Sequence, residues 1–99
     1  MNVQYWLLPY AEQLMALFPE RRVTSSWRSW SAQALLYRRY ITGRSRYPAA
    51  PPGRSMHQYG RAFDVDDRDP AQLVQMGAVW ESWGGRWGGR GGDPIHFEA

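Results

Sequence analysis

The sequence predicts an α+β fold in which a small, mainly antiparallel sheet packs against helices. Three stretches repeat apolar residues at helical spacing, and two short stretches, 62–66 and 95–98, alternate between apolar and polar residues. Each alternating stretch places an apolar pair on one face and polar side chains on the other, as a half-buried strand does. A chain of 99 residues is expected to form one domain, residues 1–99.

The first helix is expected to begin at Pro9, because proline is favourable at the first helical position, and to end at Pro19. Its predicted apolar face consists of Tyr10, Leu14, Leu17 and Phe18. The β-branched stretch from Arg21 to Trp27 then predicts a strand that leads to Arg28.

A second helix follows, for which Ser29 or Ser31 can supply the cap and Gly43 the left-handed residue beyond its end. Its predicted apolar face consists of Ala32, Leu35, Leu36 and Tyr40. Residues 44–53 are rich in Pro, Arg and Ala, which predicts an extended loop.

In the alternating stretch 62–66, Phe63 and Val65 share one face, while Ala62, Asp64 and Asp66 share the other. We interpret Asp66 either as a residue that supports a metal-binding side chain without touching the metal or as a solvent-exposed residue. A third helix is expected to begin with Asp69 as its cap and Pro70 as its first residue. Its predicted apolar stripe consists of Leu73, Met76, Trp80 and Trp83.

The glycine-rich stretch 84–92 is expected to be a loop or a mobile lid. In the last alternating stretch, Ile95 and Phe97 face one side, while His96 and Glu98 face the other. Both predicted strands therefore present their polar residues on the face opposite the apolar pair.

Composition narrows the possible functions. Twelve basic and nine acidic residues give a net charge of +3 and a pI near 9.7, which favours a polyanionic partner such as nucleic acid or a bacterial wall. The absence of cysteine excludes disulfides and thiolate metal sites. The N-terminus has no signal-peptide pattern and no stretch reaches transmembrane length, so we expect cytoplasmic synthesis and no membrane insertion.

The chain has only two histidines, His57 and His96, and each is expected in a strand-like segment with carboxylates nearby. His57, Asp64 and His96 supply three nitrogen or oxygen ligands, a set that suits zinc (Zn²⁺) better than magnesium or calcium. The alternative is that both histidines are structural or surface residues. A calcium loop in the run 64–69 is disfavoured because an EF-hand would need other residues at Asp69 and Gln75.

Two further residues are candidates for catalysis. Asp93 lies three residues before His96, and a turn at Pro94 can aim its carboxylate at a metal-bound water as a general base. Asp93 can equally be a turn residue before proline. Arg28 can hold a substrate carboxylate with its planar guanidinium, or it is one of the solvated basic residues.

Two motifs resemble those of a known family. Ser55-x-His57-x-x-Gly60-x-Ala62-x-Asp64 and Asp93-x-x-His96-Phe97-Glu98 resemble the zinc peptidases of the D-Ala-D-Ala carboxypeptidase (VanY-like) and phage L-alanyl-D-glutamate endopeptidase family. The stretch Ser26-Trp27-Arg28-Ser29, the following Gln33 and the Trp-Gly-Gly segment from Trp83 to Gly89 also resemble that family. The resemblance runs from about Val23 to Glu98.

The resemblance implies a DD-peptidase/hedgehog-like fold with a zinc site on one face of the sheet. The metal ligands that it implies are His57, Asp64 and His96. It also implies that Asp93 is the catalytic base and that Arg28 lies near the substrate carboxylate or the scissile carbonyl. Substrate contacts are expected from Arg28, Gln33 and Ser55.

The predicted function is hydrolysis of a stem-peptide amide bond in bacterial peptidoglycan. An L-alanyl-D-glutamate endopeptidase of endolysin type is favoured, with a D-Ala-D-Ala carboxypeptidase as the alternative. We expect a monomer without a separate wall-binding domain that reaches the wall by a holin-type route or within a virion. The alternatives from other classes are a nucleic-acid-binding module with an RGG-like tract at residues 84–92, and a metal-stabilised interaction domain without turnover.

Overall fold

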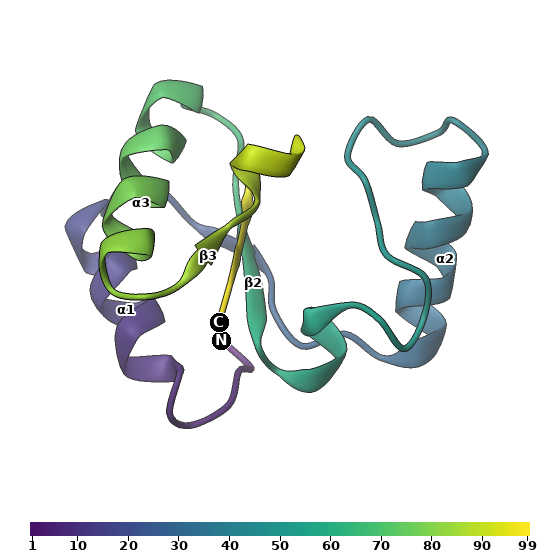
Figure 1. The fold of residues 1–99 in the computed structure, drawn as a ribbon, viewed down its shortest axis with the longest axis horizontal. Coiled ribbons are helices and arrows are strands. Elements are labelled where there is room, and N and C mark those ends of the chain that lie inside the picture. The colour runs from purple at the N-terminus through teal and green to yellow at the C-terminus, as the bar shows by residue number, and fades with distance from the viewer.

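The computed structural model describes residues 1–99 and contains three α-helices and a four-stranded sheet (Figure 1). The helices are α1 (Leu8–Leu17), α2 (Trp30–Ile41) and α3 (Pro70–Ser82). The strands are β1 (Val23–Ser25), β2 (Ala62–Val65), β3 (Arg86–Trp87) and β4 (His96–Glu98). Two short 3₁₀ helices are η1 (Met56–Tyr59) and η2 (Gly88–Gly91). The predicted α+β class is confirmed.

The sheet has the strand order β1-β2-β4-β3, and each neighbouring pair is antiparallel. In the central pair, Phe63 lies opposite Phe97 and Asp64 lies opposite His96. Since successive side chains point to opposite faces of a strand, the two phenylalanines share one face and Asp64 and His96 share the other. The alternation predicted from the sequence is therefore confirmed.

The hydrophobic core lies between the phenylalanine face of the sheet and the helices α1 and α3 (Figure 1). Phe63 stacks on Phe97 with ring centroids 5.4 Å apart, and Trp80 of α3 meets Phe63 edge-on at 5.3 Å. All three rings are at least 98% buried, with exposed fractions of 0%, 0% and 2%. Such aromatic pairs supply much buried area from few residues, which a chain of this size requires.

The helix α1 presents only part of its predicted face to the core, since Leu14 is buried and Phe18 packs against the core as expected. Leu7, Ala11 and Leu14 are buried, whereas Tyr10 and Leu17 are 51% and 56% exposed. Apolar residues occur on every side of this segment, so its periodicity does not select one stripe. Only contact with α3 and the sheet decides which stripe is buried.

The predicted apolar face of α2 is wrong, because this helix does not join the core. Figure 1 shows α2 on the side of the sheet opposite α1 and α3, and Gln33 is its only buried residue. Leu35 and Tyr40 are half exposed. The predicted cap is confirmed, since the Ser29 hydroxyl accepts a hydrogen bond from the amide of Ala32.

The helix α3 follows the prediction. Asp69 accepts a hydrogen bond from the amide of Gln72 at 3.1 Å, and Pro70 is the first helical residue. Leu73, Met76 and Trp80 are buried. No helix combines the length and apolar character needed to cross a bilayer.

The glycine-rich segment is folded rather than a plain loop, which corrects the prediction. It forms β3, which pairs with β4, and then η2. The Trp87 ring lies directly against Gly77 and Gly89, and its indole nitrogen donates to the carbonyl oxygen of Pro94 at 2.8 Å. Gly89 of this segment and Gly77 of α3 therefore leave the space that the Trp87 ring occupies.

Candidate metal centre

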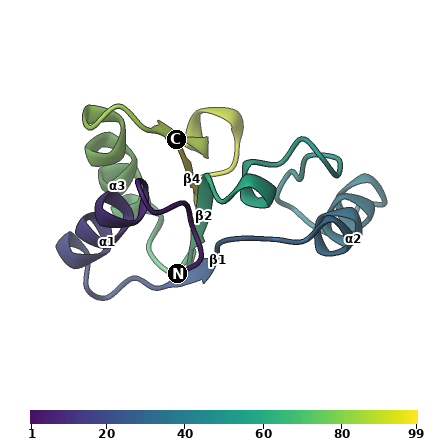
Figure 2. The ribbon, with the colours of Figure 1, turned by 90° about the horizontal axis from the view of Figure 1, so that it is seen from below.

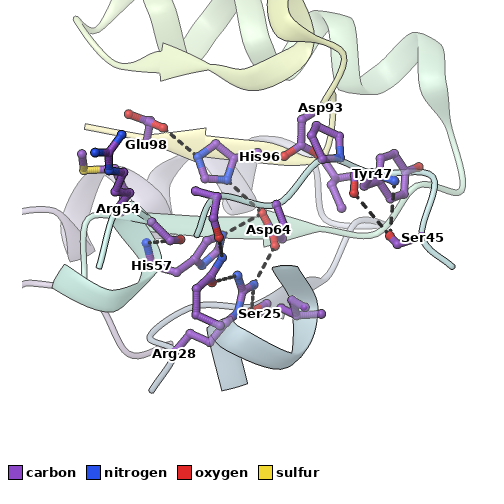
Figure 3. Close-up of a pocket in the computed structure, with 18 residues that line it drawn as sticks. Ser25, Arg28, Ser45, Tyr47, Arg54, His57, Asp64, Asp93, His96 and Glu98 are labelled. Carbon is purple, nitrogen blue, oxygen red and sulfur yellow. Dashed lines mark hydrogen bonds and ion pairs between the residues drawn. The ribbon is translucent and has the colours of Figure 1, made fainter. Parts of the chain in front are cut away.

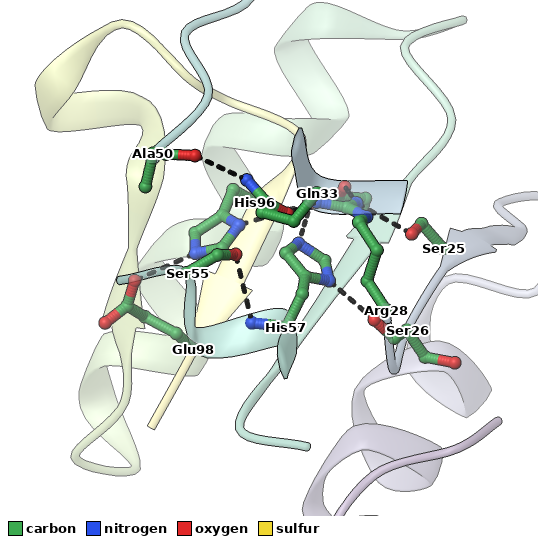
Figure 4. A network of polar contacts seen from close by, with 10 residues as sticks. Ser25, Ser26, Arg28, Gln33, Ala50, Ser55, His57, His96 and Glu98 are labelled. Carbon is green, nitrogen blue, oxygen red and sulfur yellow. Dashed lines mark hydrogen bonds and ion pairs between the residues drawn. The ribbon is translucent and has the colours of Figure 1, made fainter. Parts of the chain in front are cut away.

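His57 lies in η1, whereas the sequence predicted a strand-like segment. Ser55 precedes this turn, and its hydroxyl accepts a hydrogen bond from the His57 amide at 3.3 Å. Gly60 ends the turn in the left-handed conformation, with φ of 67°. The turn directs the buried His57 ring towards β2 (Figure 4).

The sheet register brings the other two candidate ligands beside His57. Asp64 and His96 are direct cross-strand neighbours on the face opposite the core. The rings of His57 and His96 are 5.1 Å apart between centroids. One ligand atom from each of the three residues lies within 4.8 Å of the others, so this group can hold a metal ion.

The hydrogen bonds of the two rings leave nitrogen lone pairs that face Asp64. Nδ1 of His57 lies 2.7 Å from the carbonyl oxygen of Ser26, and Nε2 of His96 lies 2.8 Å from a carboxylate oxygen of Glu98. Each of these nitrogens therefore donates its proton outward. The remaining ring nitrogens lie 3.1 Å and 3.2 Å from the same Asp64 oxygen, Oδ1.

The two remaining ring nitrogens and the Asp64 oxygen are all acceptors, so a positive charge must lie between them. Protons on the rings can supply it, and so can one metal ion. Metal-binding histidines ordinarily donate their other ring nitrogen to a carbonyl or a carboxylate, and both histidines here do so. The donor set therefore fits a metal ion. Glu98 is a partner that the residue-by-residue interpretation missed, although its position two residues after His96 placed both on one face of a strand.

Charges in the site are strongly coupled. Burial alone would raise the pKa of Asp64, but hydrogen bonds from His57 and His96 outweigh it and lower the pKa below its ordinary range. Burial opposes the charged form of His96, yet the bonds to Asp64 and Glu98 raise the pKa of its ring to about 9. The hydrogen bond from His96 in turn lowers the pKa of Glu98. The pocket thus favours a positive charge beside Asp64.

The second oxygen of Asp64 is held by Arg28 (Figure 3). The guanidinium of Arg28 donates to Oδ2 of Asp64 at 3.2 Å, to Ser25 at 2.8 Å and to Gln33 at 2.7 Å. Gln33 is 1% exposed, and its amide nitrogen donates to the carbonyl oxygen of Ala50 at 2.7 Å. Arg28, Gln33 and Ser55 all line the same cavity, but each has a bonding partner within the protein.

Asp93 lies in the same cavity without a partner for one of its carboxylate oxygens. Its Oδ1 atom is buried and makes no hydrogen bond. Burial, together with the negative charge of Asp64, raises the pKa of Asp93 to about 6. A half-buried carboxylate with a buried, unpaired oxygen and a pKa near neutrality has the character of a general base.

The cavity has a volume of about 720 Å³ and lies between the ligand face of the sheet and the segment that contains α2 and residues 44–54 (Figure 3). Figure 3 shows His57, Asp64 and His96 in its middle, with Arg54 and Tyr47 towards opposite ends. Its size is typical of small-molecule and peptide sites. The sequence did not single out Tyr47 or Arg54, because neither belongs to a recognisable motif.

Comparisons with known proteins agree with this arrangement. The family model VanY, D-alanyl-D-alanine carboxypeptidase, matches residues 11–88 of the chain. That range includes His57 and Asp64 and ends before Asp93 and His96, which the antiparallel β2–β4 pair brings to them. No curated protein matches the chain.

Among solved structures, the chain is similar to one described as "Structure of the LdcB LD-carboxypeptidase reveals the molecular basis of peptidoglycan recognition". The TM-score is 0.64 at 24% sequence identity, and the similarity covers 87% of this chain. The match covers 55% of the other chain, so this chain spans little more than half its length. At this identity the likeness shows a shared fold.

Proposed function

The chain belongs to the VanY family of D-alanyl-D-alanine carboxypeptidases, and we propose that it is a zinc-dependent peptidase of bacterial peptidoglycan. The observation that carries the proposal is the convergence of His57, Asp64 and His96 in a cavity that also holds the unpaired carboxylate of Asp93. Two imidazoles and one carboxylate, without any cysteine, form a ligand set that suits zinc.

Each residue has a distinct task in the proposed reaction. When bound, zinc would polarise the scissile carbonyl and lower the pKa of water. Asp93 accepts the proton of the attacking water at Oδ1 and returns it to the leaving nitrogen as the amide bond breaks. Arg28 fixes the orientation of Asp64 through Oδ2. Substrate contacts of Arg28, Gln33 and Ser55 remain part of the proposal, since all three line the cavity.

The proposed bond is a stem-peptide amide, and two sites of cleavage are candidates. The motifs around Trp83 to Gly89 and His96 to Glu98 favour an L-alanyl-D-glutamate endopeptidase of endolysin type. The match to the carboxypeptidase family favours removal of a terminal D-alanine. In either case one water molecule adds across one amide bond and yields a new carboxylate and a new amine.

Digestion of purified peptidoglycan followed by mass spectrometry of the products tests the proposal. An endopeptidase releases stem peptides and leaves L-alanine on the sugar, whereas a carboxypeptidase shortens the stem by one alanine. Asp64→Ala should abolish either product, while Glu20→Gln, at an exposed carboxylate outside the cavity, should leave it unchanged. Unaltered peptidoglycan after incubation with zinc-loaded protein would refute the proposal.

A further inference from the structure

A second hollow adjoins the metal centre through η1. It has a volume of about 560 Å³, and Gln58 and Tyr59 line it while His57 lines the cavity of the metal centre. Three aromatic side chains surround it with unusually exposed rings: Tyr5 is 85%, Trp27 55% and Tyr59 50% exposed. Exposed rings gathered around one hollow mark a binding surface more often than scattered ones do.

The other polar side chains of this hollow are three amides, and no charged side chain lines it. The amide nitrogen of Gln4 donates to the carbonyl oxygen of Tyr59, and the amide oxygen of Gln58 accepts from the backbone of Gly53. Each glutamine therefore keeps one free group, and the Asn2 side chain has no partner in the protein. The hollow thus offers both donors and acceptors beside its rings.

The hollow is held in shape by backbone hydrogen bonds. The N-terminal segment lies beside β1 (Figure 2), and the carbonyl of Asn2 accepts from the amide of Trp27 at 2.9 Å. The amide of Gln4 donates to the carbonyl of Gly60 at 2.8 Å. A side chain at Gly60 would come within 3.2 Å of that amide nitrogen, so glycine permits the close approach. A preorganised surface loses less entropy when it binds a ligand.

These features match the chemistry of a neutral amino sugar. The negative face of an aromatic ring attracts the C–H groups on the flat side of a pyranose, and amides pair with hydroxyl and acetamido groups. The absence of charged side chains disfavours phosphate or carboxylate ligands. We propose that this hollow binds an N-acetylhexosamine unit of the peptidoglycan glycan strand next to the stem peptide, an inference that rests on the proposed function.

Titration of the protein with tetra-N-acetylchitotetraose, followed by NMR, tests this directly because the probe contains no peptide. Amide signals of Gln4, Tyr5, Trp27 and Gly60 should shift together and saturate. Tyr5→Ala and Trp27→Ala should each weaken binding at least about fivefold, since a lost ring contact is worth about that factor. Tyr10→Ala, at a half-exposed tyrosine of α1 outside the hollow, is the matched control and should bind normally.

Absence of saturable shifts, or equal affinity in Tyr5→Ala and wild type, would overturn the proposal. Tight binding of an oligodeoxythymidylate that is lost in the same variants would also overturn it, because the surface would then be one for nucleic acid. Asp93→Asn should bind the oligosaccharide normally while its hydrolysis falls, so sugar binding and catalysis fail separately. Tyr5→Ala should hydrolyse a sugar-free stem peptide at the wild-type rate and raise KM only for glycan-linked substrate.

Discussion

Arg28 is bonded to three side chains, and this affects the role expected for it. Its guanidinium holds Oδ2 of Asp64 while Oδ1 of the same carboxylate faces both histidines. Side chains that orient a metal ligand in this way influence metal affinity even though they do not touch the metal. If Arg28 only held the substrate carboxylate, its substitution would change KM and kcat and leave the metal affinity unchanged.

We predict that Arg28→Lys lowers zinc affinity about 10- to 100-fold, because the single nitrogen of an ammonium cannot reproduce the planar fork whose two nitrogens hold Asp64, Gln33 and Ser25. Competition with a fluorescent chelator measures this. Arg54→Lys is the control, since Arg54 lines the same cavity without an ion pair and should keep wild-type affinity. Unchanged zinc affinity in Arg28→Lys together with a raised KM would favour the substrate clamp.

Asp93→Asn should separate catalysis from stability. Hydrolysis is expected to fall about 10²–10⁴-fold, the usual contribution of a positioned base, while zinc content stays near wild type. Because burial raises the pKa of Asp93 to about 6, the ionised form costs stability once the pH rises above the ordinary aspartate value near 4. The metal-free variant should therefore melt at an equal or higher temperature than wild type at pH 7. A lower melting temperature would mean that Asp93 is structural.

At the scale of elements, Asp66 fastens β1 to the end of β2. Its carboxylate accepts from the Arg21 guanidinium at 3.0 Å and from the backbone amides of Arg22 at 2.7 Å and Arg68 at 3.2 Å. Its side chain is 14% exposed. The sequence-based interpretations of a solvated residue or one behind a ligand are both wrong, because the carboxylate faces β1 and not the metal centre.

Asp66→Asn is predicted to lower the free energy of unfolding by about 1–3 kcal/mol at pH 7, the range for charged hydrogen bonds. Burial alone would raise the pKa of Asp66, but the amides of Arg22 and Arg68 and the charge of Arg21 lower it. A lowered folded-state pKa stabilises the protein above the unfolded value near 4, and this contribution disappears as the pH falls through the folded value. Denaturant unfolding at pH 7 and pH 3 should therefore show a smaller difference at pH 3. Glu12→Gln, at an exposed residue of α1, should show almost none at either pH.

The contact between α3 and β3 gives a second prediction at this scale. Alanine is ordinarily favoured over glycine inside a helix by about 1 kcal/mol. A methyl group at Gly77, however, would overlap the ring of Trp87, so we expect Gly77→Ala to destabilise the protein by about 1–3 kcal/mol. Gly91→Ala is the matched control, because nothing lies near its Cβ position. Stabilisation by Gly77→Ala in urea denaturation would contradict the packing of Trp87 described above.

At the scale of the whole molecule, the candidate metal centre connects segments that are distant in the sequence. η1, β2 and β4 each contribute one candidate ligand, and α2 joins them through Gln33 and the segment containing Arg28. The side of the molecule that carries α2 has little apolar burial of its own. A bound ion should therefore stabilise the fold as well as the site.

Zinc at a free concentration about 1,000 times its Kd is predicted to add about 4 kcal/mol of stability, and a chelator should remove this gain. Thermal melts with zinc or with chelator measure the change. Asp64→Ala should show no zinc-dependent rise, whereas Asp93→Asn should show the full rise. A wild-type melting temperature that does not respond to zinc would reject a structural contribution from the metal.

Much of the fold and of the candidate site follows from local sequence. The alternation around Phe63 and Phe97 identified the central strands, because side-chain direction in a strand repeats every two residues. The cap at Asp69 and the start at Pro70 identified α3 for equally local reasons. The same alternation placed Asp64 and His96 on the face away from the core, whereas His57 was predicted in a strand-like segment and lies in η1.

Tertiary structure decided what depends on distant neighbours. Arg28 and Asp64 are 36 residues apart, and their contact arises only when β1 and β2 pair. The buried side of α1, the exposure of α2 and the packing of the glycine-rich segment around Trp87 likewise depend on which surfaces meet. Periodicity determines the direction of a side chain relative to its own element, whereas burial and hydrogen bonding depend on the element packed against it. The sequence alone therefore indicated the candidate ligands, and the assembled fold determined how their side chains are held.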